Sequence, residues 1–226
     1  MTSVFQHALG RDYGRLHPEL RRRFGIGLGS GEACIGAGVM DEIWRGPTLT
    51  RPFLALGGHR NILLPEIGRQ IPFIIENYPY LDSYGRETVS FVRTFQMPKR
   101  VRRFDATMVY SPARGCVVDY LGTHQHLATD LYFQADGRGG LVIRSGEHRL
   151  HEGPLSFRIP GLVTGAATVH ESYDEQTGRF RIDVHVVNRR LGPVFGYHGT
   201  FAARYAQITA QDVPVNVKPR REEART

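Results

Sequence analysis

The sequence predicts a mainly β fold that is preceded by one or two short helices. Between Ile35 and Tyr205, short runs of Val, Ile, Phe, Tyr and Thr alternate with turn residues at intervals of roughly ten residues. No helical pattern separates these runs, so consecutive strands are expected to pair antiparallel. A meander of this length with one apolar face tends to close, because closure removes unpaired edges. We therefore expect an up-and-down, lipocalin-like β-barrel; the alternative is a strongly curved sheet wrapped over a helix.

The helical segment is expected within residues 3–25. Leu16, Leu20 and Phe24 recur every fourth residue, and Pro18 suits a first helical turn. We expect residues 1–216 to form one domain that includes this segment. Residues 217–226 carry mixed charge without an apolar anchor, which predicts a disordered tail.

Alternation within the strands indicates which side chains face the interior. Phe180, Ile182, Val184 and Val186 are interleaved with polar residues, and the same period of two recurs between Phe195 and Tyr205. Tyr197 lies on the apolar face of that last strand and is a candidate for ligand contact.

Composition and charge exclude several classes of protein. With 226 residues, 41% of them hydrophobic, the chain is long enough for one globular domain with a sizeable core. The formal charge of +7 comes mostly from arginines scattered among acids, and the two basic clusters, residues 21–23 and 99–103, lack interleaved aromatics. We therefore expect no nucleic acid partner. The two cysteines are too few for a zinc knuckle, no apolar run approaches the length of a membrane span, and a cytoplasmic location is the default.

Catalytic and cofactor motifs are missing from the sequence. The glycine-rich stretch 25–38 lacks the spacing of a phosphate-binding loop, and no serine elbow or activated cysteine is recognisable. We expect no cofactor.

Charged residues on otherwise apolar strand faces are the first candidates for a ligand site. Glu87 and Arg93 share the inward face of one strand, Glu147 and Arg149 continue another, and Glu171 follows a third. Ionised groups are rarely buried unpaired, so these side chains either meet one another in a structural ion-pair network, lie at wetted strand ends, or line a polar part of a cavity.

His124 and His126 form a second candidate group, because residues two apart on an extended segment point to the same side. A metal would need a third ligand from elsewhere in the fold. Ten histidines in the chain make chance pairs common, so we expect a ligand-facing or hydrogen-bonded pair and no bound metal.

Five stretches of the sequence are distinctive: 76–78, 85–89, 103–108, 118–124 and 195–199. Together they resemble a bacterial domain-of-unknown-function family, numbered four-one-six-six. The likeness runs from Phe5 to about Tyr205. The family's motif residues correspond here to Glu87, Asp105, Asp119 and His124. The resemblance implies no established activity. It does imply that members stand alone or are fused behind a saccharopine-dehydrogenase-like reductase domain, so that a separately encoded reductase is a possible partner of this chain.

Three functions are consistent with these patterns. The first is binding of a small hydrophobic or amphipathic molecule, lipid-like or a carbonyl metabolite, with Arg93 and Arg149 holding an anionic head group. The second is an enzyme that uses a cavity carboxylate, Glu87, Glu147 or Glu171, for acid and base chemistry. The third is a protein-interaction module that binds an acidic partner through its basic loops.

Overall fold

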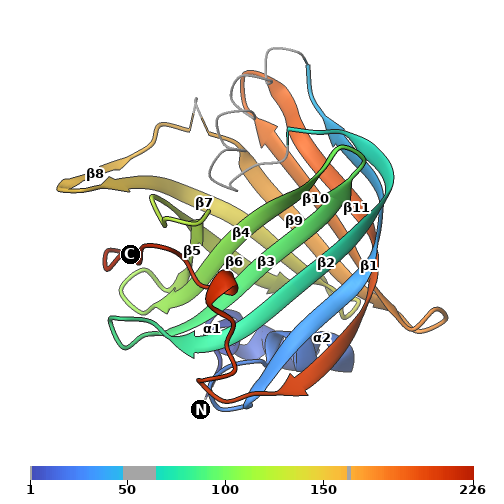
Figure 1. Cartoon of the computed structure of the whole chain (residues 1–226), viewed down its shortest axis with the longest axis horizontal. Helices are drawn as coiled ribbons and strands as arrows, with labels where there is room; N and C mark the ends of the chain where they lie inside the picture. The colour runs from blue at the N-terminus through green and yellow to red at the C-terminus, as the bar shows by residue number, and fades with distance from the viewer. Residues whose placement is uncertain (1, 48–64, 162–163) are drawn as a thin grey trace.

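The computed structural model describes residues 2–47, 65–161 and 164–226, and it is mainly β (Figure 1). In the described residues, two short α-helices and a 3₁₀-helix come first, and eleven strands and a further 3₁₀-helix follow. Their bounds are α1 Val4–Leu9, η1 Gly10–Arg15, α2 Pro18–Phe24, β1 Glu32–Arg45, β2 Gly68–Leu81, β3 Glu87–Met97, β4 Arg100–Ser111, β5 Cys116–Leu121, β6 Leu127–Ala135, β7 Leu141–Glu152, β8 Leu155–Arg158, β9 Ala166–Asp174, β10 Arg179–Asn188, β11 Gly192–Gln207 and η3 Val215–Val217.

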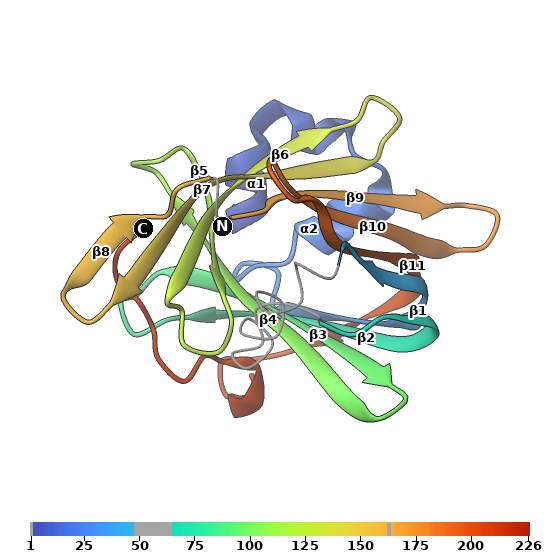
Figure 2. The ribbon, with the colours of Figure 1, turned by 90° about the horizontal axis from the view of Figure 1, so that it is seen from above.

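Ten of these strands form a closed antiparallel barrel. Neighbours along the chain pair from β1 to β7 and from β9 to β11, β7 also pairs with β9, and β11 returns to pair with β1. Strand β8 pairs with β7, and this hairpin projects from the barrel wall (Figures 1 and 2). The expected closed meander is confirmed, and the open curved sheet is not what forms.

The N-terminal helices lie across one end of the barrel (Figures 1 and 2). Ser3 caps α1, since its hydroxyl accepts a hydrogen bond from the backbone of Gln6 at 3.2 Å and the Gln6 side chain accepts one from Ser3. Phe5 and Phe24 meet edge to face, with ring centroids 5.4 Å apart, and bury the apolar faces of both helices. The helices therefore plug this end. Among the described residues, no helix is long and apolar enough to span a bilayer.

The C-terminal segment after β11 packs on the outer surface of the barrel. Val213 and Val217 cover Tyr78, Tyr80 and their neighbours on the outer face of β2 and β3. Further on, the Arg220 amide donates to the carbonyl of Thr123 at 2.7 Å.

Residues 217–226 pack against the barrel, whereas the sequence predicts a disordered tail. Tyr120 donates to the carbonyl of Arg225 at 2.7 Å, and the Glu223 amide donates to the Gln125 side chain at 2.6 Å. The Glu223 carboxylate is buried between Arg221 and Arg225. Composition alone conceals this order, because the polar partners come from β5 and from the turn that follows it.

Candidate functional site

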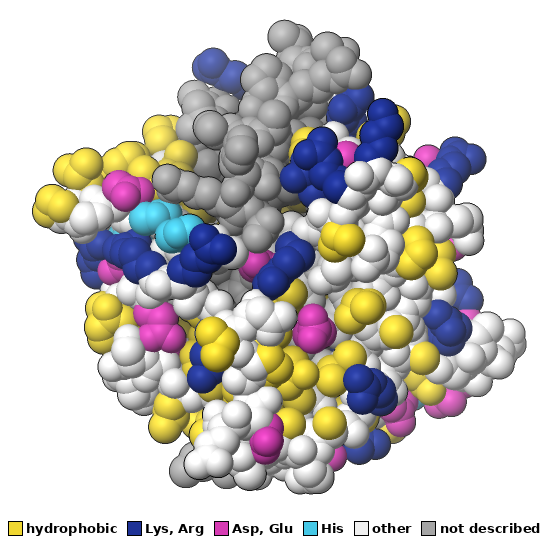
Figure 3. Space-filling model, in the orientation of Figure 1, with side chains coloured by type: hydrophobic (Ala, Val, Ile, Leu, Met, Phe, Trp, Pro, Cys, Tyr) yellow, Lys and Arg dark blue, Asp and Glu magenta, His cyan; other side chains and the backbone are white. Residues whose placement is uncertain are grey.

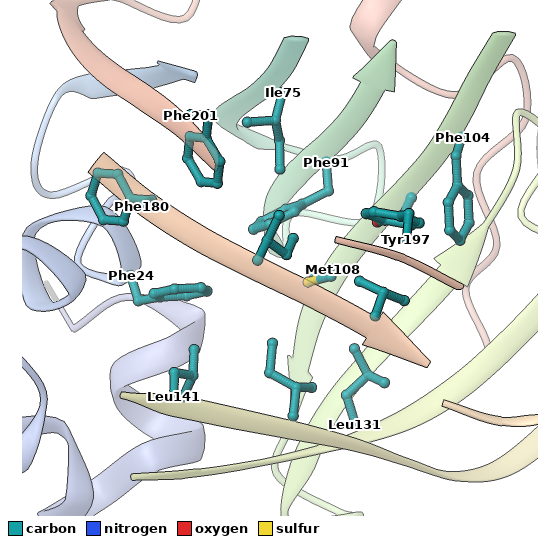
Figure 4. Close-up of a cluster of buried hydrophobic side chains, with 14 of the residues drawn as sticks. Phe24, Ile75, Phe91, Phe104, Met108, Leu131, Leu141, Phe180, Tyr197 and Phe201 are labelled. Atoms are coloured by element: carbon teal, nitrogen blue, oxygen red, sulfur yellow. The ribbon is translucent and has the colours of Figure 1, made fainter. Parts of the chain in front are cut away.

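The barrel interior contains a cavity of about 400 Å³. Its wall is mostly apolar and is built by inward-facing residues of nine barrel strands together with Phe24 of α2 and residues of the β8–β9 connection. Figure 4 shows Phe91 of β3, Phe104 and Met108 of β4 and Tyr197 of β11 converging on this region. A largely apolar cavity of this size with a few polar groups is typical of small-molecule sites.

Arg93 and Tyr197 form the polar centre of the cavity wall. Both lie at the inward positions that strand alternation predicts, on β3 and β11, and both are buried. The Arg93 guanidinium carbon lies 4.3 Å from the centroid of the Phe104 ring, which is within cation–π range. Burial raises the pKa of Tyr197, and a hydrogen bond from Arg93 to its hydroxyl works in the opposite direction. Tyr197 is therefore a neutral hydroxyl at physiological pH.

Asp119 of β5 supplies a carboxyl group to the same cavity. Its Oδ1 atom is buried and has no hydrogen-bond partner within the described part of the chain. Burial raises the pKa of Asp119 to about 7, although the charge of Arg93 opposes the shift. Near neutral pH, this carboxyl group is therefore present in both its protonated and its ionised form.

Glu171 lies in the cavity wall and is paired with an arginine from α2. The Arg23 Nε donates to the Glu171 carboxylate at 2.5 Å, and both side chains are almost completely buried. Arg23 Nη1 also donates to Asn77 at 2.7 Å. Burial raises the pKa of Glu171, and Arg23 opposes this shift. Glu171 therefore fixes α2 to the barrel wall as well as facing the cavity.

His148 of β7 lines the cavity, and its two ring nitrogens form different hydrogen bonds. Its Nε2 lies 3.1 Å from the carbonyl oxygen of Gly165, which can only accept, so Nε2 carries a proton. Its Nδ1 lies 2.9 Å from the Thr129 hydroxyl and accepts from it when the ring is neutral. Burial lowers the pKa of His148, which favours this neutral form.

The expected inward placement of Glu147 and Arg149 is wrong. Alternation is interrupted where Leu131 of β6 pairs with Ser145 and Thr129 pairs with His148, which leaves one extra residue on β7. This bulge turns His148 into the cavity in place of its odd-numbered neighbours. Glu147 and Arg149 lie 3.1 Å apart in an ion-pair network outside the cavity with Arg114, Asp130 and Arg158. For these two residues the structural alternative is the one observed.

Glu87 lies at the plugged end of the barrel and does not line the cavity. Its carboxylate accepts a hydrogen bond from the Leu28 amide at 2.7 Å and so holds the connection between α2 and β1. Of the predicted charged residues, only Arg93 and Glu171 are brought together around the cavity.

His124 and His126 also lie outside the cavity, in the turn between β5 and β6. Their rings stack with centroids 5.7 Å apart, and His126 Nδ1 lies 3.0 Å from the carbonyl of His151. No cluster of three or more metal-ligating side chains occurs within residues 2–47, 65–161 and 164–226.

Sequence reasoning missed Asp119 and His148 as cavity residues. Asp119 had one signal, since it alternates with Val117 and Leu121, which also face inward, and it belongs to the stretch that carries the family resemblance. His148 had none, because the bulge that turns it inward has no recognisable residue pattern. Of the four motif residues that the resemblance implies, only Asp119 lines the cavity.

The fold and the site define this class of protein as a ten-stranded barrel that helices close at one end. Its apolar cavity contains buried arginine, tyrosine and aspartate side chains. The chain matches the family described as a domain of unknown function (DUF4166) over residues 16–201, and it belongs to this family. It is 34% identical over 201 residues to the Bacillus subtilis (strain 168) protein named Uncharacterized protein YndH, a match that covers 89% of this chain and 97% of that protein. No solved structure matches the chain.

Proposed function

We propose that the barrel binds a small amphipathic molecule, lipid-like or a carbonyl metabolite, inside its cavity. The observation that carries this proposal is the cavity of about 400 Å³, whose wall is apolar apart from a few buried polar groups. Enclosed apolar space favours the transfer of an apolar ligand from water, and convergent polar groups fix the orientation of its head group.

Arg93 is the head-group residue in this proposal. Its side chain is held between aromatic rings and the Tyr197 hydroxyl, so its geometry is set before a ligand arrives. A carboxylate or a polarised carbonyl oxygen would accept hydrogen bonds from Arg93, and the protonated form of Asp119 would supply a further donor. Arg149, the other predicted head-group residue, has no part in it because it lies in the outer ion-pair network.

The first experiment is native mass spectrometry of the purified protein, followed by denaturing extraction and identification of any bound molecule. A titration with anilinonaphthalene sulfonate, an apolar probe with an anionic head group, then measures binding to the emptied protein. Two variants of neighbouring alanines on β9 test the location. Ala167 lines the cavity and Ala166 is exposed on the outside. We expect Ala167→Trp to weaken probe binding at least about tenfold, because the indole fills the cavity, and Ala166→Trp to leave it unchanged.

Arg93→Met tests the head-group assignment with the same probe. We expect weaker binding of the sulfonate and little change for an uncharged apolar dye. Equal binding by wild type, Ala167→Trp and Ala166→Trp would show that the probe binds on the surface and would contradict the proposal.

Asp119 favours a second candidate, acid and base chemistry on the bound molecule. A buried carboxyl group with a pKa of about 7 can both give and take a proton near neutral pH. The test is incubation of the extracted molecule with wild type and with Asp119→Asn. A product that is formed by wild type and not by the variant, with binding retained, would support an enzyme. If the molecule is unchanged in both samples, acid and base chemistry is contradicted and binding is the function that is supported.

A further inference from the structure

The end of the barrel opposite the helices has a distinctive surface, which we call the loop rim. It comprises the β3–β4, β7–β8 and β10–β11 turns with the adjoining strand ends and the residues just before β2, all at the end away from α1 and α2 (Figure 1). Six of the eleven exposed large hydrophobic side chains in the described part of the chain belong to it: Ile67, Val101, Leu155, Phe157, Val187 and Leu191.

Each turn of the loop rim combines exposed apolar side chains with basic ones. Leu155 and Phe157 are 60% and 50% exposed and precede Arg158. Val101 follows Lys99 and Arg100, and Figure 3 shows basic side chains grouped along this upper edge of the molecule. Single exposed hydrophobic residues are ordinary on protein surfaces, but their repetition beside cations at one end is the pattern of interfacial binding.

The β10–β11 turn repeats this combination, with Arg189 and Arg190 between Val187 and Leu191. All four side chains are exposed. This turn therefore offers two charges and two apolar contacts within five residues.

The charge of the connections differs between the two ends of the barrel. At the loop rim, the described connections outside strands carry Lys99, Arg189 and Arg190. The acid among them, Glu66, forms ion pairs with Arg100 and Arg102. At the helix end, the connections between strands contain three acids, Asp82, Asp136 and Glu175, and three arginines, Arg86, Arg114 and Arg138, so their charges balance. The three cations and one acid of the loop-rim connections thus leave a net charge of +2 beside the exposed apolar residues.

We propose that the loop rim docks on an anionic lipid surface. Each basic side chain near such a surface contributes on the order of 1 kcal/mol, and apolar side chains that enter the head-group region add to it. The cavity wall extends to Ile159 and Gly165 in the β8–β9 connection at this end, whereas Phe24 lies at the other end. Docking would bring the cavity close to the lipid and would allow a ligand to exchange between them. This role in ligand exchange rests on the proposed function, whereas the docking itself does not.

The test is co-sedimentation of the full chain with vesicles of phosphatidylcholine alone and of phosphatidylcholine mixed equally with phosphatidylglycerol. We expect binding to the anionic vesicles that weakens as salt is added, and little binding to the neutral ones. Leu155→Ser is compared with Leu81→Ser, since both leucines are 60% exposed and Leu81 lies at the helix end. Only the Leu155 variant should weaken binding.

A second pair of variants tests the charges. Arg189→Glu/Arg190→Glu should weaken binding to anionic vesicles by about tenfold or more, whereas Arg11→Glu/Arg15→Glu, with exposed arginines at the helix end, should have a much smaller effect. Equal effects of the two double variants, or binding that ignores lipid charge, would overturn the proposal. So would association with an acidic protein but not with vesicles.

Ala167→Trp separates this proposal from the previous one. The variant is expected to lose the cavity probe and keep vesicle binding. If the wild type binds vesicles but not the probe, only the proposed cavity function is contradicted. If it binds the probe but not the vesicles, only the docking proposal is contradicted.

Discussion

Arg23 extends from α2 into the barrel and contacts polar groups of three strands, β9, β1 and β2. It donates to Glu171 and Asn77, and its Nη1 lies 3.3 Å from the Cys34 sulfur. Its guanidinium also lies over the Phe201 ring, 5.0 Å from the centroid. A buried pair of this kind offsets its desolvation only while both partners are present, so either side chain alone is an uncompensated buried charge.

We expect Arg23→Met and Glu171→Gln each to lower the free energy of unfolding by about 3–5 kcal/mol. The double variant Arg23→Met/Glu171→Gln should lose much less than the sum, because no charge stays unpaired. Urea unfolding of the four proteins forms a double-mutant cycle. Arg22→Met is the control, since its pair with Glu32 is at the surface and should contribute at most about 1 kcal/mol. Additive losses in the cycle would contradict the coupling.

Asp119 should make stability depend on pH in an unusual direction. Its pKa is about 7 in the folded protein and 3.8 as an ordinary aspartate, so between these values the folded state binds more protons and stability falls as pH rises. Asp119→Asn removes this dependence. Relative to wild type, the variant should gain about 3 kcal/mol between about pH 5 and pH 8. Urea unfolding at both pH values measures this gain, and Asp41→Asn, at an exposed position on β1, should show none.

At the scale of elements, the β1–β11 pairing closes the barrel and depends on a very close approach of the two backbones. A Cβ atom at Gly38 would lie 2.0 Å from the carbonyl oxygen of Thr200, which is rigid backbone. Only glycine allows this spacing. The pairing of β1 with β11, which closes the barrel, therefore requires a residue without a side chain at this position of β1.

Gly38→Ala should lower the free energy of unfolding by about 2 kcal/mol or more, because the added methyl forces β1 and β11 apart. Gly14→Ala in η1 is the matched control, since a Cβ there would meet nothing within 4 Å. It should have no effect or stabilise slightly. Thermal or urea unfolding measures the stability of the two variants. Similar free energies of unfolding for both would show that β1 and β11 can relax around the methyl group.

The C-terminal segment depends on Glu223 for its attachment. Hydrogen bonds from Arg225 lower the pKa of Glu223 to about 2, so the stability it provides is present above the ordinary glutamate pKa of 4.5 and is lost as pH falls toward 2. Glu223→Gln should cost about 2 kcal/mol at neutral pH, measured by urea unfolding, and the difference from wild type should disappear in acid. Glu222→Gln, at the neighbouring and more exposed position, should cost less than about 1 kcal/mol. A loss for Glu223→Gln that persists in acid would contradict this account.

Element-level patterns explain how far the sequence predicted the fold and the site. The hairpin rhythm and alternation predicted the closed meander, and they placed Arg93, Glu171 and Tyr197 correctly in the interior. The same rule failed on β7, because one bulge between Ser145 and His148 shifts every following side chain to the opposite face. The attachment of residues 217–226 was missed for a different reason, since it depends on tertiary hydrogen bonds that leave no local periodicity.

At the scale of the whole molecule, the barrel wall separates two sets of titratable groups. Burial raises the pKa of the interior acids Asp119 and Glu171. On the outside, hydrogen bonds from arginines lower the pKa of Glu223, and they also lower that of Asp130 despite its partial burial. The interior acids therefore favour the folded state as pH falls, whereas the outer acids disfavour it.

Buried histidines complete the balance and lead to a prediction for the wild-type protein. Burial lowers the pKa of His148 and His151 below the ordinary value of 6.5, so stability declines as pH falls through that region. Over the same range, protonation of Asp119 adds stability, and the two effects oppose each other. Wild type should therefore lose less stability between about pH 7 and pH 5 than the histidines alone would cause, and it should then lose stability steeply below about pH 4 as the outer acids are protonated.

Asp119→Asn tests this balance, because it removes the compensating acid and leaves the histidines. Its free energy of unfolding should decline more steeply than that of wild type from about pH 6.5 downward. A urea-unfolding series across the pH range, run on both proteins, measures the two profiles. Parallel profiles would mean that Asp119 stays ionised inside the barrel, and the cavity would then hold a permanent negative charge beside Arg93.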